Sequence, residues 1–288
     1  MIVVMGATGA TGSAVLDRLV TLGIPSRALS RDPAGLRAGL SAEACALVQT
    51  HAADAADPQS LRAAFVGASQ LFLAMANSPA QVAHETAAIA VAAECGVRHI
   101  VKLSAPAATP DSPVAFSRWH HEIEQALDAS GLPHTVLRPY AFMQKLVTLA
   151  PPILAEGVVL GALGAAACNY VDCRDIGDAA VEVLTRPDLV GETYTLTGSR
   201  TFTYPELVDL LSLVLDRPIR YLDLPPQAMY EHLVRRAGLP DWLAAHVVEI
   251  QQLAVHRPES PTDTVEKLLG RAPRTVEAFL SENIHQFR

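Results

Sequence analysis

Short apolar runs alternate with amphipathic stretches over the first two-thirds of the chain. The runs are rich in β-branched residues and contain almost no polar alternation, which is typical of strands buried on both faces of a sheet. Between them, apolar residues recur at the spacing of one helix face. We expect strands at 2–5, 26–30, 46–50, 70–75, 99–103 and 135–137. We expect helices at 13–22, 58–65, 80–95 and 116–130. This alternation predicts βαβ units, and therefore an α/β fold with a doubly wound parallel sheet.

Two stretches break the alternation. Residues 104–114 contain three prolines and should form a loop at the carboxyl end of a strand, where α/β sheets bind ligands. After residue 200 the pattern becomes mainly helical, with an amphipathic helix expected over 204–215. Prolines then divide the remaining sequence into short helices. We interpret this part as a small, mainly helical C-terminal lobe.

A glycine-rich sequence lies between the first expected strand and the first expected helix. Its residues are Gly6, Ala7, Thr8, Gly9, Ala10, Thr11 and Gly12. In a dinucleotide-binding turn, the first glycine permits the sharp turn, the second lets the backbone approach a pyrophosphate, and the third lets helix and strand pack closely. The spacing is G-x-x-G-x-x-G rather than G-x-G-x-x-G, and a turn without a ligand could have the same glycines. Because strand, turn and helix occur in order, we predict a Rossmann fold that binds a dinucleotide here.

This assignment gives a division of the chain. Residues 1–199 form the expected NAD(P)-binding Rossmann domain, and residues 200–288 form a smaller lobe that covers the substrate. Residues 146–168 are expected to contribute to the cleft between them.

The residues after the second strand favour NADP(H) over NAD(H). NAD sites usually have an acidic residue here for the ribose hydroxyls, whereas this chain has Ser30 and Arg31. Arg31 can pair with a 2′-phosphate and Ser30 can donate to it. The alternative is that Arg31 is a solvated surface residue, and the neighbouring Asp32 weakens the NADP(H) interpretation. After the third strand, Asp54 can hold the adenine edge or cap the helix that starts near residue 58.

Composition argues against several other classes of protein. The net charge is -8 and no basic cluster occurs, so we expect no nucleic-acid partner. We find no signal peptide and no apolar segment long enough to span a bilayer, and therefore expect a cytoplasmic protein without a membrane partner. The 4 cysteines do not complete a metal-binding set, so we expect buried thiols and no metal site.

Longer motifs along the chain carry a family resemblance. Besides the glycine-rich turn and Arg31, they lie at 97–104, 120–124, 130–133, 137–139, 142–144, 170–176, 193–198, 202–211 and 273–279. Together they resemble the NmrA-like branch of the atypical short-chain dehydrogenase/reductase family, which includes triphenylmethane reductase and NAD(P)H:quinone oxidoreductases. The resemblance covers essentially the whole chain. It implies a Rossmann domain, a small C-terminal lobe and a substrate cleft between them.

The resemblance also implies which residues line the nicotinamide side of the cofactor. These are Ala74, Met75, Ala76, Pro139, Tyr140 and Phe142. One position departs from the family pattern, because Lys145 stands where asparagine usually follows Phe142-Met143-Gln144.

The tyrosine–lysine pair of ordinary short-chain dehydrogenases is absent. The matching positions are Phe116 and His120, and phenylalanine cannot donate a proton. Three catalytic candidates remain. Ser104 can orient a substrate oxygen or cap a loop. His120 can hold the nicotinamide ribose, relay protons or be structural. Tyr140 can donate to the substrate or only pack.

An electron-poor conjugated acceptor needs positioning and exclusion of water more than an acid, because hydride transfer is the chemistry of the cofactor. The sequence therefore favours an NADPH-dependent oxidoreductase acting on a small apolar or aromatic substrate, such as a quinone, dye, iminium ion or enone. We expect a monomer or a homodimer. Two alternatives stay open: a non-catalytic NADP(H)-binding redox sensor, and a non-redox isomerase or cyclase on the same scaffold.

Overall fold

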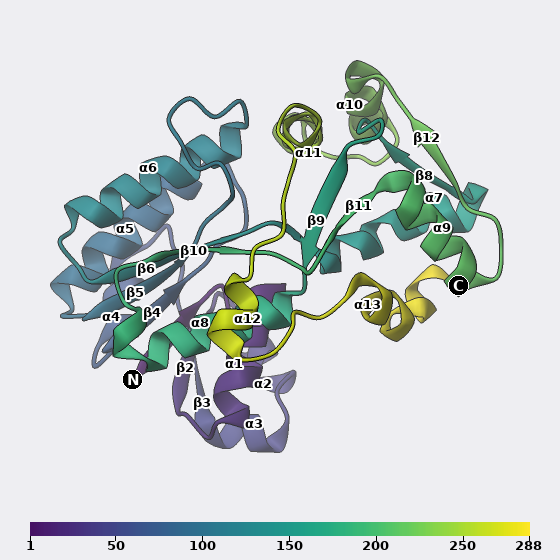
Figure 1. The fold of residues 1–288 in the computed structure, drawn as a ribbon. Coiled ribbons are helices and arrows are strands. Elements are labelled where there is room, and N and C mark those ends of the chain that lie inside the picture. The colour runs from purple at the N-terminus through teal and green to yellow at the C-terminus, as the bar shows by residue number, and fades with distance from the viewer.

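A computed structural model describes all 288 residues of the chain (Figure 1). Seven parallel strands form the main sheet, in the order β10-β6-β5-β4-β1-β2-β3. Their bounds are β1 (Ile2–Met5), β2 (Ser26–Ser30), β3 (Val48–Ala52), β4 (Gln70–Leu73), β5 (His99–Leu103), β6 (His134–Pro139) and β10 (Thr193–Leu196). The strand order reverses beside β1, which pairs with both β2 and β4. In such sheets the ligand site lies at the carboxyl ends of the strands near this reversal.

Helices cover both faces of the main sheet, as expected for a doubly wound fold (Figure 1). One face carries α1 (Ala10–Thr21), α8 (Cys173–Thr185) and α12 (Thr264–Leu269), whose apolar side chains share a core with alternate strand residues. The other face carries α4 (Pro58–Phe65), α5 (Gln81–Glu94) and α6 (Ala115–Ala129). The strands are buried on both faces because consecutive side chains enter opposite cores, as Val3 and Val4 do. The predicted fold class is confirmed.

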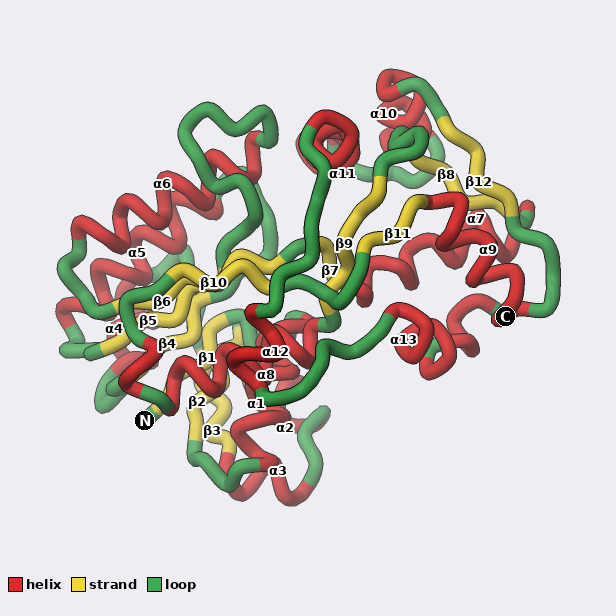
Figure 2. The backbone as a smooth tube through the Cα atoms, in the orientation of Figure 1, coloured by secondary structure: helices red, strands yellow, loops and turns green.

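A second lobe lies beyond the carboxyl edge of the main sheet (Figure 2). Its strands form two small sheets, β11-β9-β7 and β12-β8. The strands are β7 (Ala141–Phe142), β8 (Val158–Gly161), β9 (Ala167–Val171), β11 (Thr201–Thr203) and β12 (Arg220–Asp223). The helices are η1 (Met143–Leu149), α7 (Ala150–Glu156), α9 (Tyr204–Leu215), α10 (Pro226–Arg235), α11 (Asp241–His256), α13 (Val276–Glu282) and η3 (Ile284–Phe287). The short elements α2 (Pro33–Ala38), α3 (Ala42–Leu47) and η2 (Pro187–Leu189) complete the chain.

The core of the second lobe and the two cores of the Rossmann domain do not divide the chain at residue 199. The core of the second lobe contains Met143, Ile153 and Tyr170 together with residues from 202 to 287. In return, Val265 and Leu268 of α12 pack into the core of the Rossmann domain. The chain therefore crosses between the lobes several times, and these crossings bring distant residues together at the junction.

Most expected elements occur within two or three residues of their predicted bounds. Strand β3 begins at Val48 instead of 46, because α3, capped by Ser41, occupies 42–47. Strand β10 was not predicted; it pairs with β6 at the edge of the main sheet. The expected proline-rich loop of residues 104–114 connects β5 to α6.

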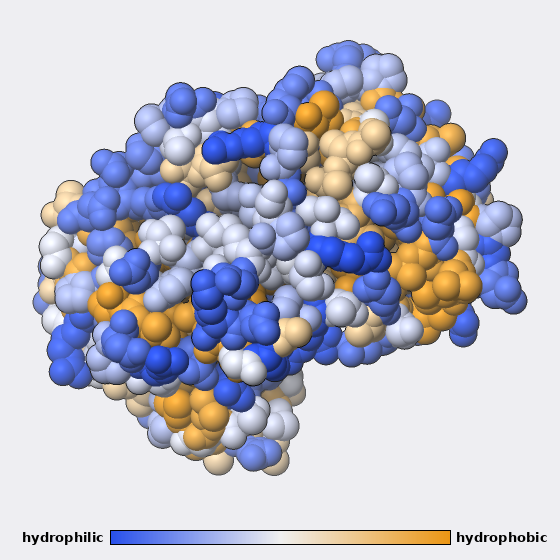
Figure 3. All heavy atoms as spheres, viewed as in Figure 1, coloured by the Kyte–Doolittle hydropathy of each residue, from blue (hydrophilic) through white to orange (hydrophobic).

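The surface is mostly polar, and the cysteines form no disulfide. The face in view is largely polar, with an apolar area at the end of the second lobe near the C-terminus (Figure 3). In this lobe, Leu213 of α9 and Leu154 of α7 are exposed. All 4 cysteines are free; Cys168 and Cys173 are buried as expected, but Cys45 and Cys95 are only half-buried. None of the helices is both long enough and apolar enough to cross a membrane.

Candidate functional site

The glycine-rich turn joins β1 to α1 in a conformation that two of its glycines make possible. Gly6 has a φ of 78°, and a Cβ there would lie 2.4 Å from the carbonyl oxygen of Ala74. A Cβ on Gly12 would lie 2.1 Å from the carbonyl oxygen of Gly6. Any larger residue at either position would displace the backbone of the turn. These two glycines are needed for the fold of the turn itself.

Gly9 differs from the other two glycines. A Cβ there would meet only the carbonyl oxygen of Gly6, at 3.4 Å, so the other side of Gly9 is open. Gly9 is also the N-cap of α1, and no side chain caps the first turn of that helix. The free N–H groups and the positive end of the helix dipole are a suitable environment for a phosphate. The geometry thus fits a dinucleotide, with room for its pyrophosphate beside Gly9.

The remaining residues of the turn support this cradle. Thr8 and Ala10 are exposed, whereas Ala7 and Thr11 are buried. The Thr11 hydroxyl lies 3.7 Å from the Cys173 sulfur of α8, which ties the helix start to its neighbour on the same face of the sheet.

After β2, the Arg31 side chain makes no ion pair within the chain, whereas Ser30 and Asp32 on either side of it form local hydrogen bonds. Arg31 is exposed and forms no ion pair within the chain. The Asp32 carboxylate accepts a hydrogen bond of 2.9 Å from the Gly35 N–H and caps α2. The Ser30 hydroxyl bonds to both backbone groups of Asp32 at 3.0 Å. Asp32 therefore has a local structural role that does not compete with an NADP(H) interpretation, while Ser30 is less free than expected.

Asp54 does not cap the next helix. Asp57 caps α4 by accepting from the Gln59 N–H, whereas Asp54 accepts from the Ala56 N–H in the turn before it. Asp54 stays exposed near the carboxyl end of β3. Of the two roles expected for this residue, helix capping is wrong, and contact with the adenine edge stays a prediction.

The residues expected near the nicotinamide follow β4 and β6 at the carboxyl edge of the main sheet. Ala74 is buried against Gly6, Met75 is half-buried and Ala76 is exposed. Pro139 is the last residue of β6, and Phe142 ends the short strand β7. Because β4 pairs with β1 and β5 pairs with β6, these segments lie along the same edge as the glycine-rich turn. Their place along this edge is compatible with the expected role, which stays a prediction.

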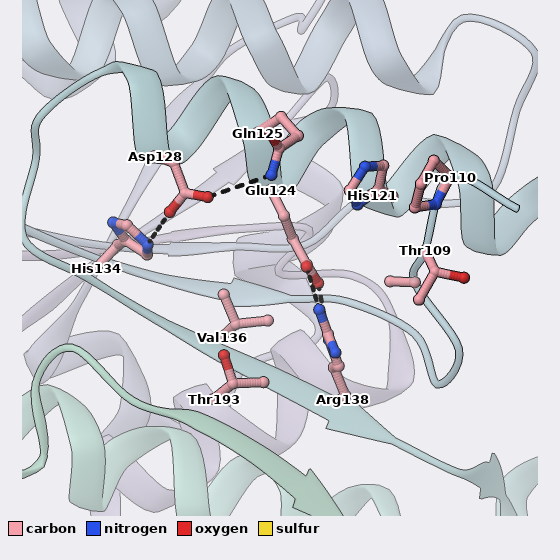
Figure 4. Close-up of a pocket in the computed structure, with 11 residues that line it drawn as sticks. Thr109, Pro110, His121, Glu124, Gln125, Asp128, His134, Val136, Arg138 and Thr193 are labelled. Atoms are coloured by element: carbon pink, nitrogen blue, oxygen red, sulfur yellow. Dashed lines mark hydrogen bonds and ion pairs between the residues drawn. The ribbon is translucent and has the colours of Figure 1, made fainter. Parts of the chain in front are cut away.

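Ser104 forms a hydrogen bond to a carboxylate that is part of an internal ion pair. Its hydroxyl donates to Glu124 Oε1 at 2.5 Å, and both side chains are buried. The same carboxylate accepts two hydrogen bonds from the Arg138 guanidinium of β6 (Figure 4). A hydroxyl has one hydrogen to donate, so Ser104 has none left for a substrate oxygen in this arrangement. Ser104 therefore has a structural contact in this structure, and its expected role in orienting a substrate oxygen stays a prediction.

His120 is buried on α6 next to a second buried charge network. Its Nδ1 lies 3.1 Å from the Nζ of Lys102 on β5, and Lys102 Nζ lies 2.9 Å from the carboxylate of Glu85 on α5. The Gln81 amide donates to the other oxygen of Glu85 at 2.8 Å. Burial, followed by the nearby Lys102 ammonium, holds the pKa of His120 well below its ordinary value. His120 is therefore a neutral imidazole at pH 7.

The second lobe adds a residue that the sequence did not indicate. His246 of α11 meets the edge of the Phe116 ring with centroids 4.8 Å apart, and Phe116 meets His120 in the same manner at 4.3 Å. His246 Nδ1 is buried and has no hydrogen-bond partner in the chain. Burial lowers the pKa of His246 to about 4. Helix α11 is held here by Glu249, whose carboxylate accepts from the Ala115 N–H at the start of α6.

Tyr140 lies between β6 and β7. It is half-buried, and its hydroxyl makes no hydrogen bond within the chain. Burial, with the nearby Glu259 carboxylate as the second cause, raises the pKa of Tyr140. Glu259 accepts from the Asn169 N–H, and burial raises the pKa of Glu259 to about 7. Sequence reasoning missed Glu259 because it lies in the link between α11 and α12 and belongs to no motif.

A separate hollow of about 320 Å³ lies between α6 and the strands β6 and β10 (Figure 4). Figure 4 shows Glu124 and Arg138 facing each other across it, with His134 paired to Asp128 at 3.1 Å. Its lining is mostly polar, and it includes none of the residues of the glycine-rich turn. The hollow is therefore distinct from the expected nucleotide site.

The chain is similar to known NAD(P)H-dependent reductases over its whole length. An NAD(P)H azoreductase of Xenophilus azovorans is 34% identical over 100% of this chain and 99% of that protein. A (4-alkanoyl-5-oxo-2,5-dihydrofuran-3-yl)methyl phosphate reductase of Streptomyces griseus is 36% identical over 100% of this chain and 99% of that protein. Among solved structures, an NADPH-dependent quinone oxidoreductase of Escherichia coli in complex with NADPH superimposes with a TM-score of 0.88. It is 26% identical, and the match covers 99% of this chain and 100% of that one.

The family itself matches residues 1–280. This agrees with the resemblance expected from the motifs, and the named relatives agree with the expected reductase class and NADP(H) cofactor. The chain belongs to the NmrA-like family.

Proposed function

We propose that this protein is an NADPH-dependent reductase that transfers hydride to a small, electron-poor conjugated acceptor. Azo compounds, quinones and oxo-dihydrofurans, which appear in the names of its relatives, all contain a conjugated π system that accepts electrons readily. The acceptors differ in their polar groups but share this electronic property. The proposal therefore names a class of acceptor and not a single compound.

The chain has a suitable place for each part of the cofactor. The open side of Gly9 and the uncapped start of α1 would hold the pyrophosphate. Arg31 would pair with the 2′-phosphate, since its guanidinium is free while Asp32 is turned toward α2. Asp54 would lie toward the adenine. Bound NADPH would supply the hydride.

The observation that carries the proposal is the set of side chains at the junction of α6 and α11. Phe116 replaces the proton-donating tyrosine of ordinary short-chain dehydrogenases, and its ring contacts two neutral imidazoles, His120 and His246. Such a surface can pack against an aromatic acceptor and offer hydrogen bonds, but it lacks the acid that an unactivated carbonyl needs. The Tyr140 hydroxyl makes no hydrogen bond within the chain, and its raised pKa keeps it protonated.

The test is anaerobic oxidation of NADPH with a panel of quinones, azo dyes, cationic dyes and enones, together with calorimetry of NADPH and NADH binding. We expect turnover with at least one acceptor class and tighter binding of NADPH than of NADH. Tight NADPH binding without any turnover would contradict the reductase proposal and favour a redox sensor. Conversion of a substrate without net NADPH oxidation would favour an isomerase or cyclase.

A further inference from the structure

Lys102 is fully buried and faces three acceptors. Its Nζ lies 2.9 Å from a Glu85 carboxylate oxygen, 3.1 Å from His120 Nδ1 and within hydrogen-bond distance of the Leu103 carbonyl oxygen. Burial of a lysine is rare without such partners, and the pairing with Glu85 keeps it as an ammonium ion. An ammonium group donates three hydrogens and accepts none.

This arrangement determines the hydrogen position on His120. Since Lys102 can only donate, Nδ1 of His120 has to accept, and the single hydrogen of the neutral ring then lies on Nε2. Nε2 makes no hydrogen bond within the chain, and it is not one of the fully buried side-chain atoms that lack a partner. It is therefore available to a ligand beside Phe116.

The charges around His120 keep the ring neutral. Burial and, after it, the positive charges of Lys102 on β5 and Arg138 on β6 disfavour a positive charge on the ring. His246 of α11 is itself neutral near pH 7 and supplies no compensating negative charge. Glu85 of α5 is paired with Lys102, and Glu124 of α6 is paired with Arg138. No carboxylate is left to stabilise an imidazolium.

We propose that Lys102 is a positioning residue that fixes His120 as a neutral Nε2–H donor aimed at the acceptor. This part of the inference rests on the reductase function proposed above, which supplies the acceptor. The N–H would stabilise the negative charge that develops on the acceptor as hydride arrives. A donor held in place before the reaction needs no reorganisation when that charge appears. Because the ring stays neutral, His120 neither supplies nor removes a proton.

The direct test is nitrogen-15 NMR of the histidine-labelled, full-length protein, with His120→Gln used to assign the signals. We expect the His120 ring to show hydrogen on Nε2 and none on Nδ1 from pH 6 to pH 8, a window of about two units around neutrality. Hydrogen on Nδ1, or a doubly protonated ring at pH 7, would overturn the proposal. The measurement needs no acceptor, so it distinguishes failure of this assignment from failure of the reductase function.

The role of Lys102 is tested by removing its charge together with that of Glu85, so that no lone charge stays buried. In Lys102→Met/Glu85→Gln we expect the His120 ring to populate both hydrogen positions and to titrate at a higher pH than in the wild type. The pH profile of kcat/KM should then gain an acid limb. An unchanged ring signal in the folded double variant would overturn the positioning role.

Two single variants keep the proposal testable if the double variant does not fold. A glutamine amide can place N–H near the position of Nε2, whereas an asparagine amide reaches only the Nδ1 position. We expect His120→Gln to retain most of the wild-type kcat/KM and His120→Asn to lose about 10-fold, the usual worth of one good hydrogen bond. Equal losses in both variants, with circular dichroism unchanged, would contradict the donor role of Nε2.

Discussion

The glycine-rich turn is built from one continuous segment, whereas the junction of α6 and α11 is built from residues that are far apart in the sequence. The turn is made by seven consecutive residues, and it would hold its ligand with backbone N–H groups and a helix dipole. The junction is made by Glu85, Lys102, Phe116, His120 and His246, which come from both lobes. It would recognise a ligand by side-chain shape and hydrogen bonds.

The difference suggests how one scaffold can keep its cofactor while its acceptor changes. Backbone contacts tolerate substitution of many side chains, so a pyrophosphate site persists as long as its glycines do. Side-chain contacts change with each substitution and with each shift of the second lobe. Substitutions in the two regions should therefore separate cofactor binding from acceptor turnover.

Gly9→Val should cause the largest loss. A Cβ at Gly9 would make only an ordinary contact with the Gly6 carbonyl oxygen, at 3.4 Å, and the valine would occupy the open space expected to hold the pyrophosphate. We therefore expect a folded variant with at least about 100-fold weaker NADPH binding by calorimetry. The matched variant is Gly12→Val, whose Cβ would collide with the Gly6 carbonyl oxygen. It should lose thermal stability as well as binding. Wild-type affinity in Gly9→Val would show that the turn does not contact the cofactor.

Arg31→Ala should separate the two dinucleotides. The lost charge-assisted hydrogen bonds to the 2′-phosphate would weaken NADPH binding by about 10- to 100-fold and leave NADH binding nearly unchanged. Arg37→Ala is the control, since Arg37 is also exposed but lies in the last turn of α2. Equal losses for NADPH and NADH would remove the 2′-phosphate assignment.

His246→Leu should affect the acceptor and spare the cofactor. The leucine keeps an apolar contact with Phe116 but removes the unpartnered Nδ1, so we expect about a 10-fold lower kcat/KM for the acceptor with an unchanged Kd for NADPH. His256→Leu, near the exposed end of the same helix, should leave both quantities unchanged. A weaker NADPH affinity in His246→Leu would place the cofactor, and not the acceptor, against this ring.

Glu259 should make stability depend on pH in the direction opposite to most carboxylates. Burial raises its pKa from 4.5 to about 7, so between these values the folded protein binds more protons at Glu259 than the unfolded chain. This contribution to the free energy of unfolding is fully present below pH 4.5 and is lost as pH rises through 7.

Urea unfolding at several pH values measures the effect of Glu259. In Glu259→Gln, the free energy of unfolding should decline less than in the wild type between about pH 5 and about pH 8. The control Glu122→Gln, at an exposed position of α6, should retain the wild-type pH dependence. A wild-type decline in Glu259→Gln would assign the pH dependence to another group.

Local patterns in the sequence determined the family, the fold class and the position of the cofactor turn. Periods of apolar residues and the order of strand, glycine turn and helix depend on near neighbours, so a single chain segment reveals them. The edge strand β10 was missed because only its pairing with β6 makes residues 193–196 a strand.

Only the tertiary structure decided the chemistry of the junction. The sequence did not show that the Ser104 hydroxyl donates its hydrogen to Glu124, which lies 20 residues further along the chain. His120 was identified from its family position, but its neutral state follows from burial and then from Lys102, and the proposed hydrogen on Nε2 follows from Lys102 on another element. His246 and Glu259 belong to no motif and acquire their altered pKa values by burial. Burial and electrostatic pairing are properties of neighbours in space, and a sequence does not show which residues those neighbours are.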